Sequence, residues 1–351
     1  MLVGTVGLPI RKDAADRNEI ERWALQLIGY SPWEMEMKRR GIFGLAGALV
    51  TAVITAGSRA NTPAGSRKRG YADGPFGLVH FHDNGADGLP LILCHQSPQS
   101  ARQFDEALPE LAKRGIRAIA VDTPGFGMSE PTPFVPKIED YAKAIPAVMD
   151  HLHIAKTNIL GHHTGAVVAT EVALQFPNRI LKLILNGAHP MDEDERRRGL
   201  ENNVNHEQNF LYQPDGTHLS KNFVLRSGMY GPGCDANYLT RAVCDKFMGY
   251  GPFWYGHHAA YSYSHNDSLP KIKHQAMILT NTGDQIYRNA QIARKIRPDF
   301  VYTELQGGTI DITVQQTAAW ADSVAAFLRS RGSRAHLKSL SVKNSNLITR
   351  R

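Results

Sequence analysis

Short, predominantly apolar runs alternate with longer amphipathic segments through the middle of the chain. Runs in which most residues are apolar are typical of strands buried on both faces. Such runs occupy 91–95, 116–121, 157–160, 181–185 and 276–280. Apolar residues three or four positions apart, as in helices with one buried face, occupy 101–113, 138–151, 166–176 and 314–329. This alternation predicts a mostly parallel sheet with right-handed crossovers and helices on both faces.

The pattern continues at both ends of this region and is interrupted once. Residues 77–83 predict an antiparallel strand before the first parallel one, and 300–305 predict a strand before the closing helix. Residues 190–270 break the alternation with a charged run followed by Asn, Gly, His and aromatic residues. We interpret 190–270 as a mostly helical cap inserted after the sixth strand, and 71–189 with 271–330 as the core.

The two ends of the chain differ from this core. Residues 1–36 form a leader of uncertain role, and a basic Lys-Arg-Arg then precedes the uncharged run 41–57. This order predicts a signal peptide at 37–60 and an exported protein, periplasmic or secreted. A membrane anchor, or a cytoplasmic protein with a buried N-terminal helix, is the alternative. Residues 61–70 are interpreted as a linker, and 331–351 as a basic, disordered tail.

The distribution of charge along the chain limits the class of partner that the protein is expected to bind. The chain has a formal net charge of +7, which by itself would suggest nucleic acid. Residues 37–70 contain seven basic and no acidic residues, residues 331–351 contain six and none, and the central 71–330 carries −4. Because no basic face lies in the core, we do not expect the protein to bind nucleic acid. We expect a small-molecule substrate, with membrane contact only through the N-terminal segment; the oligomeric state is left open.

Cysteines are too few for a disulfide framework. Cys94 lies within a predicted strand and is expected to be buried. Cys234 and Cys244 either pair, if the protein is exported, or remain two separate thiols.

A tight turn within 158–166 joins a predicted strand to a predicted helix. Gly161 and Gly165 lie two residues before and after His163, where only small residues allow so sharp a reversal. The central side chain, that of His163, then stands exposed above the end of the sheet. This arrangement resembles the nucleophile elbow of the α/β-hydrolase superfamily.

Two further stretches carry the same resemblance. Residues 95–100 read His-Gln-Ser-Pro-Gln-Ser, which resembles the superfamily's His-Gly-x-Pro-x-Ser loop, and 122–129 match its Asp-x-x-Gly-x-Gly-x-Ser segment. The resemblance covers 71–329. It implies an α/β-hydrolase fold, with a mostly parallel, eight-stranded type of sheet, helices on both faces and a helical cap insertion.

The resemblance also implies positions for the catalytic groups. Ser, Asp or Cys occupies the elbow centre in the superfamily, whereas this chain has His163 there. The acid after the seventh strand corresponds to Asp284, and the histidine after the last strand corresponds to Thr309. The oxyanion hole corresponds to the backbone amides of Thr164 and Gln96.

A histidine at the elbow centre permits a different chemistry. The positive end of the helix dipole favours the neutral imidazole of His163. A neutral imidazole beside two amide donors can act as a base on water or on an acidic substrate proton, or as a nucleophile. We expect Asp284 or Asp311 to orient the ring, and Thr309 and Asp311 to be pocket groups or loop residues with local turn bonds. The alternative is that His163 only fills an inactive elbow.

Other histidines are expected near the site. His95 ends a core strand and is expected mainly to organise the oxyanion loop beside the substrate. The cap segment 253–261 is dense in aromatic residues and histidine, and either His257 or His258 is expected to reach the pocket, with His258 chosen as the site residue. The alternative is an aromatic helix that merely packs on the core.

Metal and cofactor signals are weak. The pairs His80/His82 and His151/His153, and the adjacent His162 and His163, lack His-Glu-x-x-His spacing. Gly125-x-Gly127 lacks the rest of a dinucleotide fingerprint. We predict no metal and no cofactor.

These observations predict an atypical hydrolase in which His163 replaces the serine nucleophile. Its expected substrate is small, largely apolar and carbonyl-containing: an ester, a lactone or a compound with a scissile C–C bond. The alternatives are a cofactor-free lyase or isomerase that uses His163 as a base on carbon, and a ligand-binding protein without catalysis.

Overall fold

The computed structural model describes residues 68–330, and the statements below concern those residues. Eight strands form one sheet in the order β1-β2-β4-β3-β5-β6-β7-β8. Their bounds are β1 Lys68–Gly74, β2 Gly77–Asp83, β3 Leu89–Cys94, β4 Ile116–Val121, β5 Thr157–His162, β6 Ile180–Asn186, β7 Gln275–Asn281 and β8 Val301–Leu305. β2 pairs antiparallel with β1 and β4, and all the other pairings are parallel.

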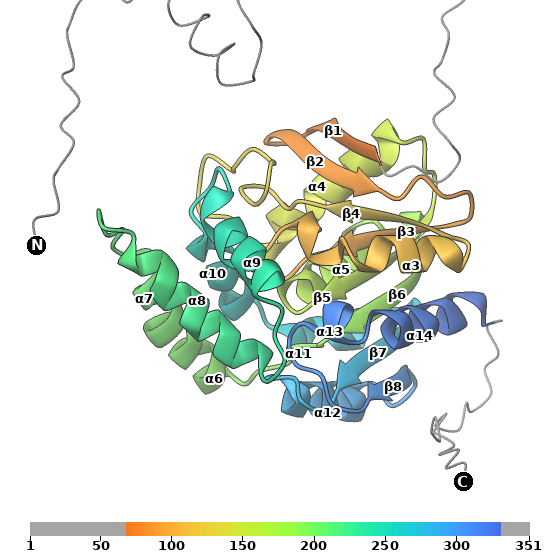
Figure 1. Ribbon diagram of the computed structural model, residues 1–351. Coiled ribbons are helices and arrows are strands. Elements are labelled where there is room, and N and C mark those ends of the chain that lie inside the picture. The colour runs from red at the N-terminus through yellow and green to blue at the C-terminus, as the bar shows by residue number, and fades with distance from the viewer. Residues whose placement is uncertain (1–67, 331–351) are drawn as a thin grey trace, which may run out of the picture. The chain divides into compact units, whose positions relative to one another are not determined.

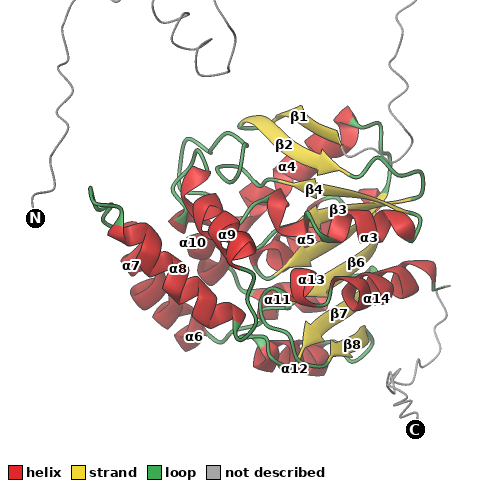
Figure 2. Ribbon diagram, in the orientation of Figure 1, coloured by secondary structure: helices red, strands yellow, loops and turns green. Residues whose placement is uncertain are grey.

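Helices cover both faces of the sheet (Figures 1 and 2). The core helices and short 3-10 turns are η1 Ala101–Phe104, α3 Ala107–Lys113, α4 Ile138–His151, α5 Thr164–Gln175, η2 Pro177–Arg179, α12 Tyr287–Ile296, α13 Ile312–Gln315 and α14 Thr317–Arg329. Two separate apolar cores result. Ile92 of β3 packs with α4 and α5 on one face, whereas Leu91 and Leu93 pack with α3 and α14 on the other. The period-two alternation of a strand sends neighbouring side chains to opposite faces.

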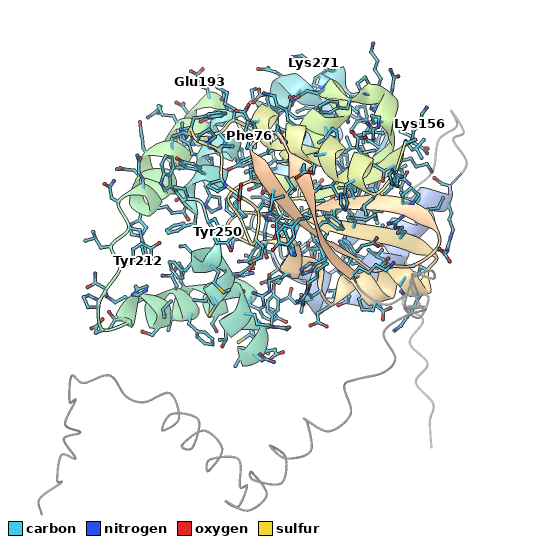
Figure 3. The ribbon with its side chains drawn as sticks, turned by 90° about the horizontal axis from the view of Figure 1, so that it is seen from above. Phe76, Lys156, Glu193, Tyr212, Tyr250 and Lys271 are labelled. Carbon is cyan, nitrogen blue, oxygen red and sulfur yellow. The ribbon has the colours of Figure 1, made fainter. Side chains whose placement is uncertain are left out.

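A helical cap lies between β6 and β7, as expected for the insertion after the sixth strand. It comprises α6 Glu193–Arg198, the π-helix η3 Gly199–Val204, α7 Asn205–Gln208, α8 Thr217–Tyr230, α9 Ala236–Met248, α10 Trp254–Ser262, α11 His265–Ser268 and η4 Leu269–Lys271. α8 projects beyond the sheet in Figure 1. Figure 3, seen from above, places Tyr212 on the outer side of the cap, far from Lys156 beside the core.

The predicted fold class is confirmed, with local differences. Residues 61–70 were expected to be a linker, but β1 begins at Lys68 and pairs with β2 along its whole length. The sequence of β1 did not predict a strand, because it contains two glycines and its side chains are mainly exposed or half-exposed. The polar helix α12 was also not expected. The predicted helices at 101–113 and 314–329 are each divided in two.

Some sequence-based expectations fall outside the described residues. The leader, the signal peptide at 37–60 and the basic tail lie there and stay predictions. Within 68–330, no helix combines the length and apolar content needed to cross a membrane. The three cysteines are free: Cys94 is buried, as predicted, and Cys234 and Cys244 are separate thiols.

Candidate active site

The elbow turn has the strained geometry that its sequence predicts. His163 has φ 50° and ψ −112° between β5 and α5, a conformation that β-carbon-bearing residues rarely adopt. A Cβ on Gly161 would lie 1.8 Å from the Gly165 carbonyl oxygen, and one on Gly165 would lie 2.1 Å from the Cys94 carbonyl oxygen. Both glycines are therefore needed for the chain to pass through this turn.

His163 is paired with the predicted acid. Its Nε2 lies 2.8 Å from Oδ2 of Asp284, whose side chain is fully buried. Burial raises the pKa of Asp284, but the charge of His163 and its hydrogen bond outweigh this effect and lower the pKa to about 2. Asp284 is therefore ionised at neutral pH and accepts the hydrogen bond.

This pairing fixes the tautomer of the imidazole. A carboxylate can only accept a hydrogen bond, so Nε2 of His163 carries the proton. In the neutral ring, Nδ1 then has a free lone pair. Nδ1 has no hydrogen-bond partner within the described residues, and it is not among the fully buried unpartnered atoms. His163 thus presents a base to the space above the elbow.

That space is a cavity of about 200 Å³ between the core and the cap. Polar residues Gln96, Ser97, Gln99, His163, Glu207, Asn222, Arg226, Lys246, His257 and Gln285 line it, together with apolar Pro98, Leu225, Met229, Ala242, Val243 and Ile310. A second cavity of about 730 Å³ shares seven of these residues, Glu207, Asn222, Leu225, Met229, Lys246, His257 and Gln285, and apart from Gln285 it is lined by cap residues. The site is therefore built by core and cap together.

The oxyanion donors are only partly available. The Thr164 N–H has no partner within residues 68–330. The Gln96 N–H, by contrast, donates to Oε1 of Gln103 at 2.9 Å. The predicted role of Gln96 as a ready donor is therefore wrong for this conformation, because Gln103 would have to move first. Gln103 was not identified from the sequence.

His162 packs against the ring of His163 within the elbow turn. It is fully buried, its ring meets that of His163 edge-on at 4.6 Å, and its Nδ1 accepts from the Gln103 amide. Burial, and then the charge of His163, hold the pKa of His162 well below its usual value. His162 therefore packs within the turn and is not part of the cavity lining.

The same residues form the group most suited to a metal within the described part of the chain. His162, His163 and Asp284 offer ligand atoms within 4.8 Å of one another. The hydrogen bond between His163 and Asp284 already satisfies two of these groups, so a cation would have to replace its proton. The absence of a metal stays a prediction.

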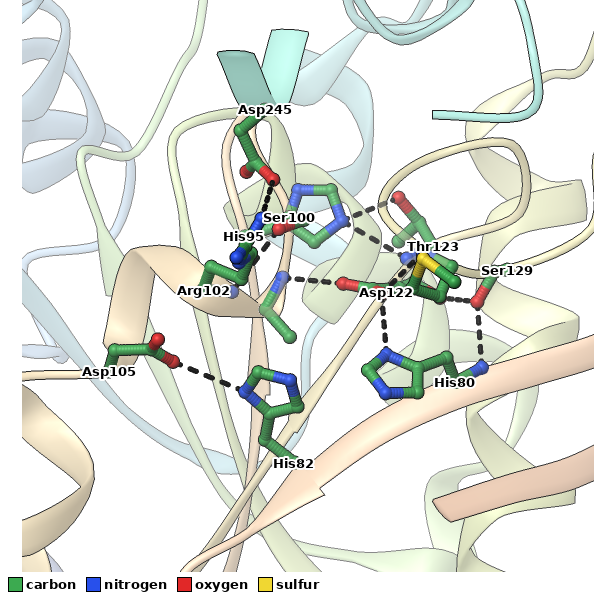
Figure 4. A network of polar contacts seen from close by, with 12 residues as sticks. His80, His82, His95, Ser100, Arg102, Asp105, Asp122, Thr123, Ser129 and Asp245 are labelled. Carbon is green, nitrogen blue, oxygen red and sulfur yellow. Dashed lines mark hydrogen bonds and ion pairs between the residues drawn. The ribbon is translucent and has the colours of Figure 1, made fainter. Parts of the chain in front are cut away.

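His95 organises its loop rather than facing the substrate (Figure 4). Its Nδ1–H donates to the Gln96 carbonyl at 2.9 Å, and its Nε2 accepts from the Thr123 N–H at 3.0 Å. Asp122 ties the same region together by accepting from the Ala101 N–H and from His80. The expected loop role is confirmed, but both ring nitrogens are occupied, and the additional assignment of His95 to substrate binding is wrong.

Thr309 and Asp311 lie outside the cavity lining. The Thr309 N–H donates to Oε1 of Gln315 at 2.6 Å, which is a local loop bond. The fully buried carboxylate of Asp311 accepts from Arg226 of α8 and, at 2.7 Å, from the Tyr238 hydroxyl of α9. Asp311 therefore fastens the cap to the core. Of the two acids expected to orient His163, Asp284 does so and Asp311 does not.

The cap contributes His257, not His258. The His258 ring meets Trp254 edge-on at 5.6 Å, and its Nδ1 is buried without a partner. The assignment of His258 to the pocket is therefore wrong. His257, one residue earlier, lines the cavity with its Nδ1 2.8 Å from Oε2 of Glu207. Adjacent helical positions are about 100° apart, so only one of the two can face the cavity.

The family model described as "alpha/beta hydrolase fold" matches residues 90–224. Among curated proteins, a 2-hydroxy-6-oxononadienedioate/2-hydroxy-6-oxononatrienedioate hydrolase of Burkholderia vietnamiensis is 33% identical over 119 residues, 33% of this chain and 41% of that protein. Haloalkane dehalogenase 2 of Mycobacterium tuberculosis is 31% identical over 116 residues, 33% and 40% of the two chains. The chain thus spans less than half the length of these relatives.

Solved structures agree on the fold. The structure of a bromoperoxidase from Bacillus anthracis superposes with a TM-score of 0.63 at 15% identity, covering 75% of this chain and all of that one. At this level of identity the similarity concerns the fold alone.

Proposed function

We propose that this chain is a hydrolase of the α/β-hydrolase superfamily in which the His163–Asp284 pair replaces a serine-centred triad. The observation that carries the proposal is the hydrogen bond of 2.8 Å from His163 Nε2 to Asp284. It leaves Nδ1 as a base facing a cavity shared by core and cap. The central position of the elbow offers no hydroxyl or thiol for acylation, since it is occupied by His163.

The proposed reaction is attack by water on a carbonyl. His163 Nδ1 takes a proton from water while the water oxygen bonds to the carbonyl carbon. Asp284 stabilises the imidazolium that forms, and the Thr164 N–H donates to the developing oxyanion. The tetrahedral intermediate then expels its leaving group, which takes up one proton from solvent, while His163 releases its proton to solvent.

The cavity favours a compact substrate with a polar centre. Its volume of about 200 Å³ is below the roughly 300–1,000 Å³ typical of drug-sized ligands. Leu225, Met229 and Val243 supply apolar contacts. A small ester, a lactone or a compound with a C–C bond next to a carbonyl fits this description.

A second candidate is a cofactor-free lyase or isomerase. The Gln96 amide is engaged by Gln103, so the site is less prepared for a tetrahedral oxyanion than for proton removal from carbon. Product mass separates the two functions, because only hydrolysis adds the mass of water.

The test compares wild type with His163→Ala on ester, lactone and β-diketone substrates. Loss of a positioned acid–base group typically lowers the rate by about 10²–10⁴, and we expect a loss of this size. His151→Ala, an exposed histidine on α4, is the matched control and should keep wild-type rates. Equal rates for wild type and His163→Ala on every substrate that turns over contradict the proposal. A ligand that is bound but never converted indicates a binding protein instead.

A further inference from the structure

We propose that His257 and Glu207 form a second catalytic pair, which faces His163 across the cavity and protonates the leaving group. This inference rests on the proposed function of His163. It also refines the substrate class, because a dedicated acid matters most for esters and lactones whose leaving group is a poorly stabilised alkoxide.

The two pairs have complementary geometry. His163 binds Asp284 through Nε2 and leaves Nδ1 unpartnered, whereas His257 binds Glu207 through Nδ1 at 2.8 Å and leaves Nε2 unpartnered. Both histidines line the same cavity. The free nitrogen of His257 is likewise not among the fully buried unpartnered atoms. Each ring is therefore held by a carboxylate on one side and open on the other.

A buried third histidine is affected by both rings. Burial, and after it the charges of His163 and His257, lower the pKa of His189 to about 3. His189 follows β6, and its ring lies 6.1 Å from that of Tyr261 of α10.

Glu207 is held in place to bind His257. The Glu207 side chain is 12% exposed, and its Oε1 lies 3.9 Å from Lys246 Nζ. Lys246 in turn lies 4.5 Å from the centre of the Phe253 ring, and its Nζ donates to Asn222. The carboxylate thus orients the His257 ring through Nδ1 and leaves Nε2 for a bound molecule.

Several elements bring charged or titratable groups to the cavity that His257 lines or to its neighbours. These groups are Glu207 of α7, Arg226 of α8, Lys246 of α9, Tyr261 of α10 itself, His189 after β6, and the His163–Asp284 pair. Arg226 is paired with Asp311, and Lys246 lies near Glu207. His257 is thus the group whose open nitrogen can exchange a proton with a bound molecule.

Two histidines with purely structural roles use both of their ring nitrogens. His265 accepts from the His189 N–H and bonds to the Thr170 hydroxyl, so both of its nitrogens are used. His95 likewise uses both nitrogens within its loop. Only one nitrogen of His257 is used, and the other is left for the cavity.

The proton balance is complete without another reactant. His163 Nδ1 removes a proton from water, and the water oxygen bonds to the carbonyl carbon. The bond from that carbon to the alkoxide oxygen then breaks with its electron pair, and the oxygen takes the proton from His257 Nε2. One water is consumed, His163 ends protonated and His257 ends neutral. Exchange with solvent restores both.

The test uses the full chain and two esters of one acid, with a p-nitrophenol or an ethanol leaving group. Nitrophenolate leaves without protonation, whereas ethoxide needs an acid. We expect His257→Gln to lower kcat for the ethyl ester by about 10²–10³ and for the nitrophenyl ester by less than about 10-fold. Glu207→Gln should show the same pattern more weakly. His258→Gln, the adjacent residue outside the cavity lining, should show no such pattern.

Equal losses on both esters, an effect on KM alone, or a match with His258→Gln would overturn the inference. If His163→Ala is inactive while His257→Gln is fully active on the ethyl ester, only this inference fails; if His163→Ala is fully active, the proposed function fails. Ring nitrogen NMR supplies a test that needs no turnover. It should show Nδ1–H as the neutral tautomer of His257, and an Nε2–H tautomer would refute the inference.

Discussion

An imidazole at the elbow needs more room than a hydroxyl, and Gly187 provides it. A Cβ on Gly187 would lie 2.4 Å from Cδ2 and 2.9 Å from Nε2 of His163. Gly187 therefore sets the ring position from which His163 reaches Asp284. It is a positioning residue and does not touch the substrate.

We predict that Gly187→Ala lowers kcat by about 10²-fold by pushing the ring away from Asp284, since small misplacements of a catalytic group cost rates of this order. Gly187 has φ +72°, so the substitution also introduces backbone strain. Gly216→Ala is the matched control, because Gly216 has φ +76° and nothing within 4 Å of its Cβ position. Kinetics of the two variants, compared at equal thermal stability, separate ring displacement from strain. Wild-type turnover in Gly187→Ala would contradict the account.

At the scale of elements, helix α9 meets the oxyanion loop through a buried acid. Asp245 is 5% exposed, and its Oδ1 lies 3.9 Å from Arg102 Nη1. Burial raises its pKa to about 6 from an ordinary 3.8, more than the opposing hydrogen bond from Ser100 lowers it. Asp245 therefore favours the folded state most when it is protonated.

The expected pH dependence follows from this direction. Because the folded-state pKa is raised, the contribution of Asp245 to stability is full below about pH 3.8 and is lost as pH rises to about 6. We predict that Asp245→Asn gains stability relative to wild type between pH 4 and pH 7, by up to about 3 kcal/mol at 1.36 kcal/mol per pKa unit. Denaturant unfolding at both pH values measures this difference. If the stability difference between Asp245→Asn and wild type does not change with pH, the prediction is contradicted. The control is Asp267→Asn at an exposed position, whose stability difference from wild type should not change with pH.

At the scale of the whole molecule, the cap is fastened to the core by a buried ion pair. Asp311 accepts from Arg226 and from Tyr238, so one carboxylate in the core holds both α8 and α9. Removing one partner of a buried ion pair leaves a charge without compensation, which is far more costly than removing both.

We predict that Arg226→Met lowers the free energy of unfolding by about 3–5 kcal/mol, or releases the cap first. The double variant Arg226→Met/Asp311→Leu should recover most of this loss. Denaturant unfolding, with hydrogen exchange of α8 and α9, measures both effects. A double variant that is less stable than Arg226→Met would show that the ion pair between Arg226 and Asp311 does not hold the cap on the core.

The core was predictable from sequence because its signals are local. Apolar runs, the glycines around His163 and the position of Asp284 after a strand each follow from a few neighbouring residues. The occupied Gln96 amide and the pairing of His257 with Glu207 do not. Gln103 lies in an adjoining 3-10 turn, and Glu207 lies 50 residues before His257. Both contacts depend on how irregular segments pack, which periodicity does not reveal.

The central claim, that His163 is the working base, is tested most directly by chemical rescue of His163→Ala. The substitution removes the imidazole but leaves Asp284 and the cavity, so added imidazole can bind where the side chain was. The account predicts turnover that rises with imidazole concentration, saturates, and follows the fraction of imidazole in its neutral form. His163→Ala that is as active as wild type without imidazole would contradict the account.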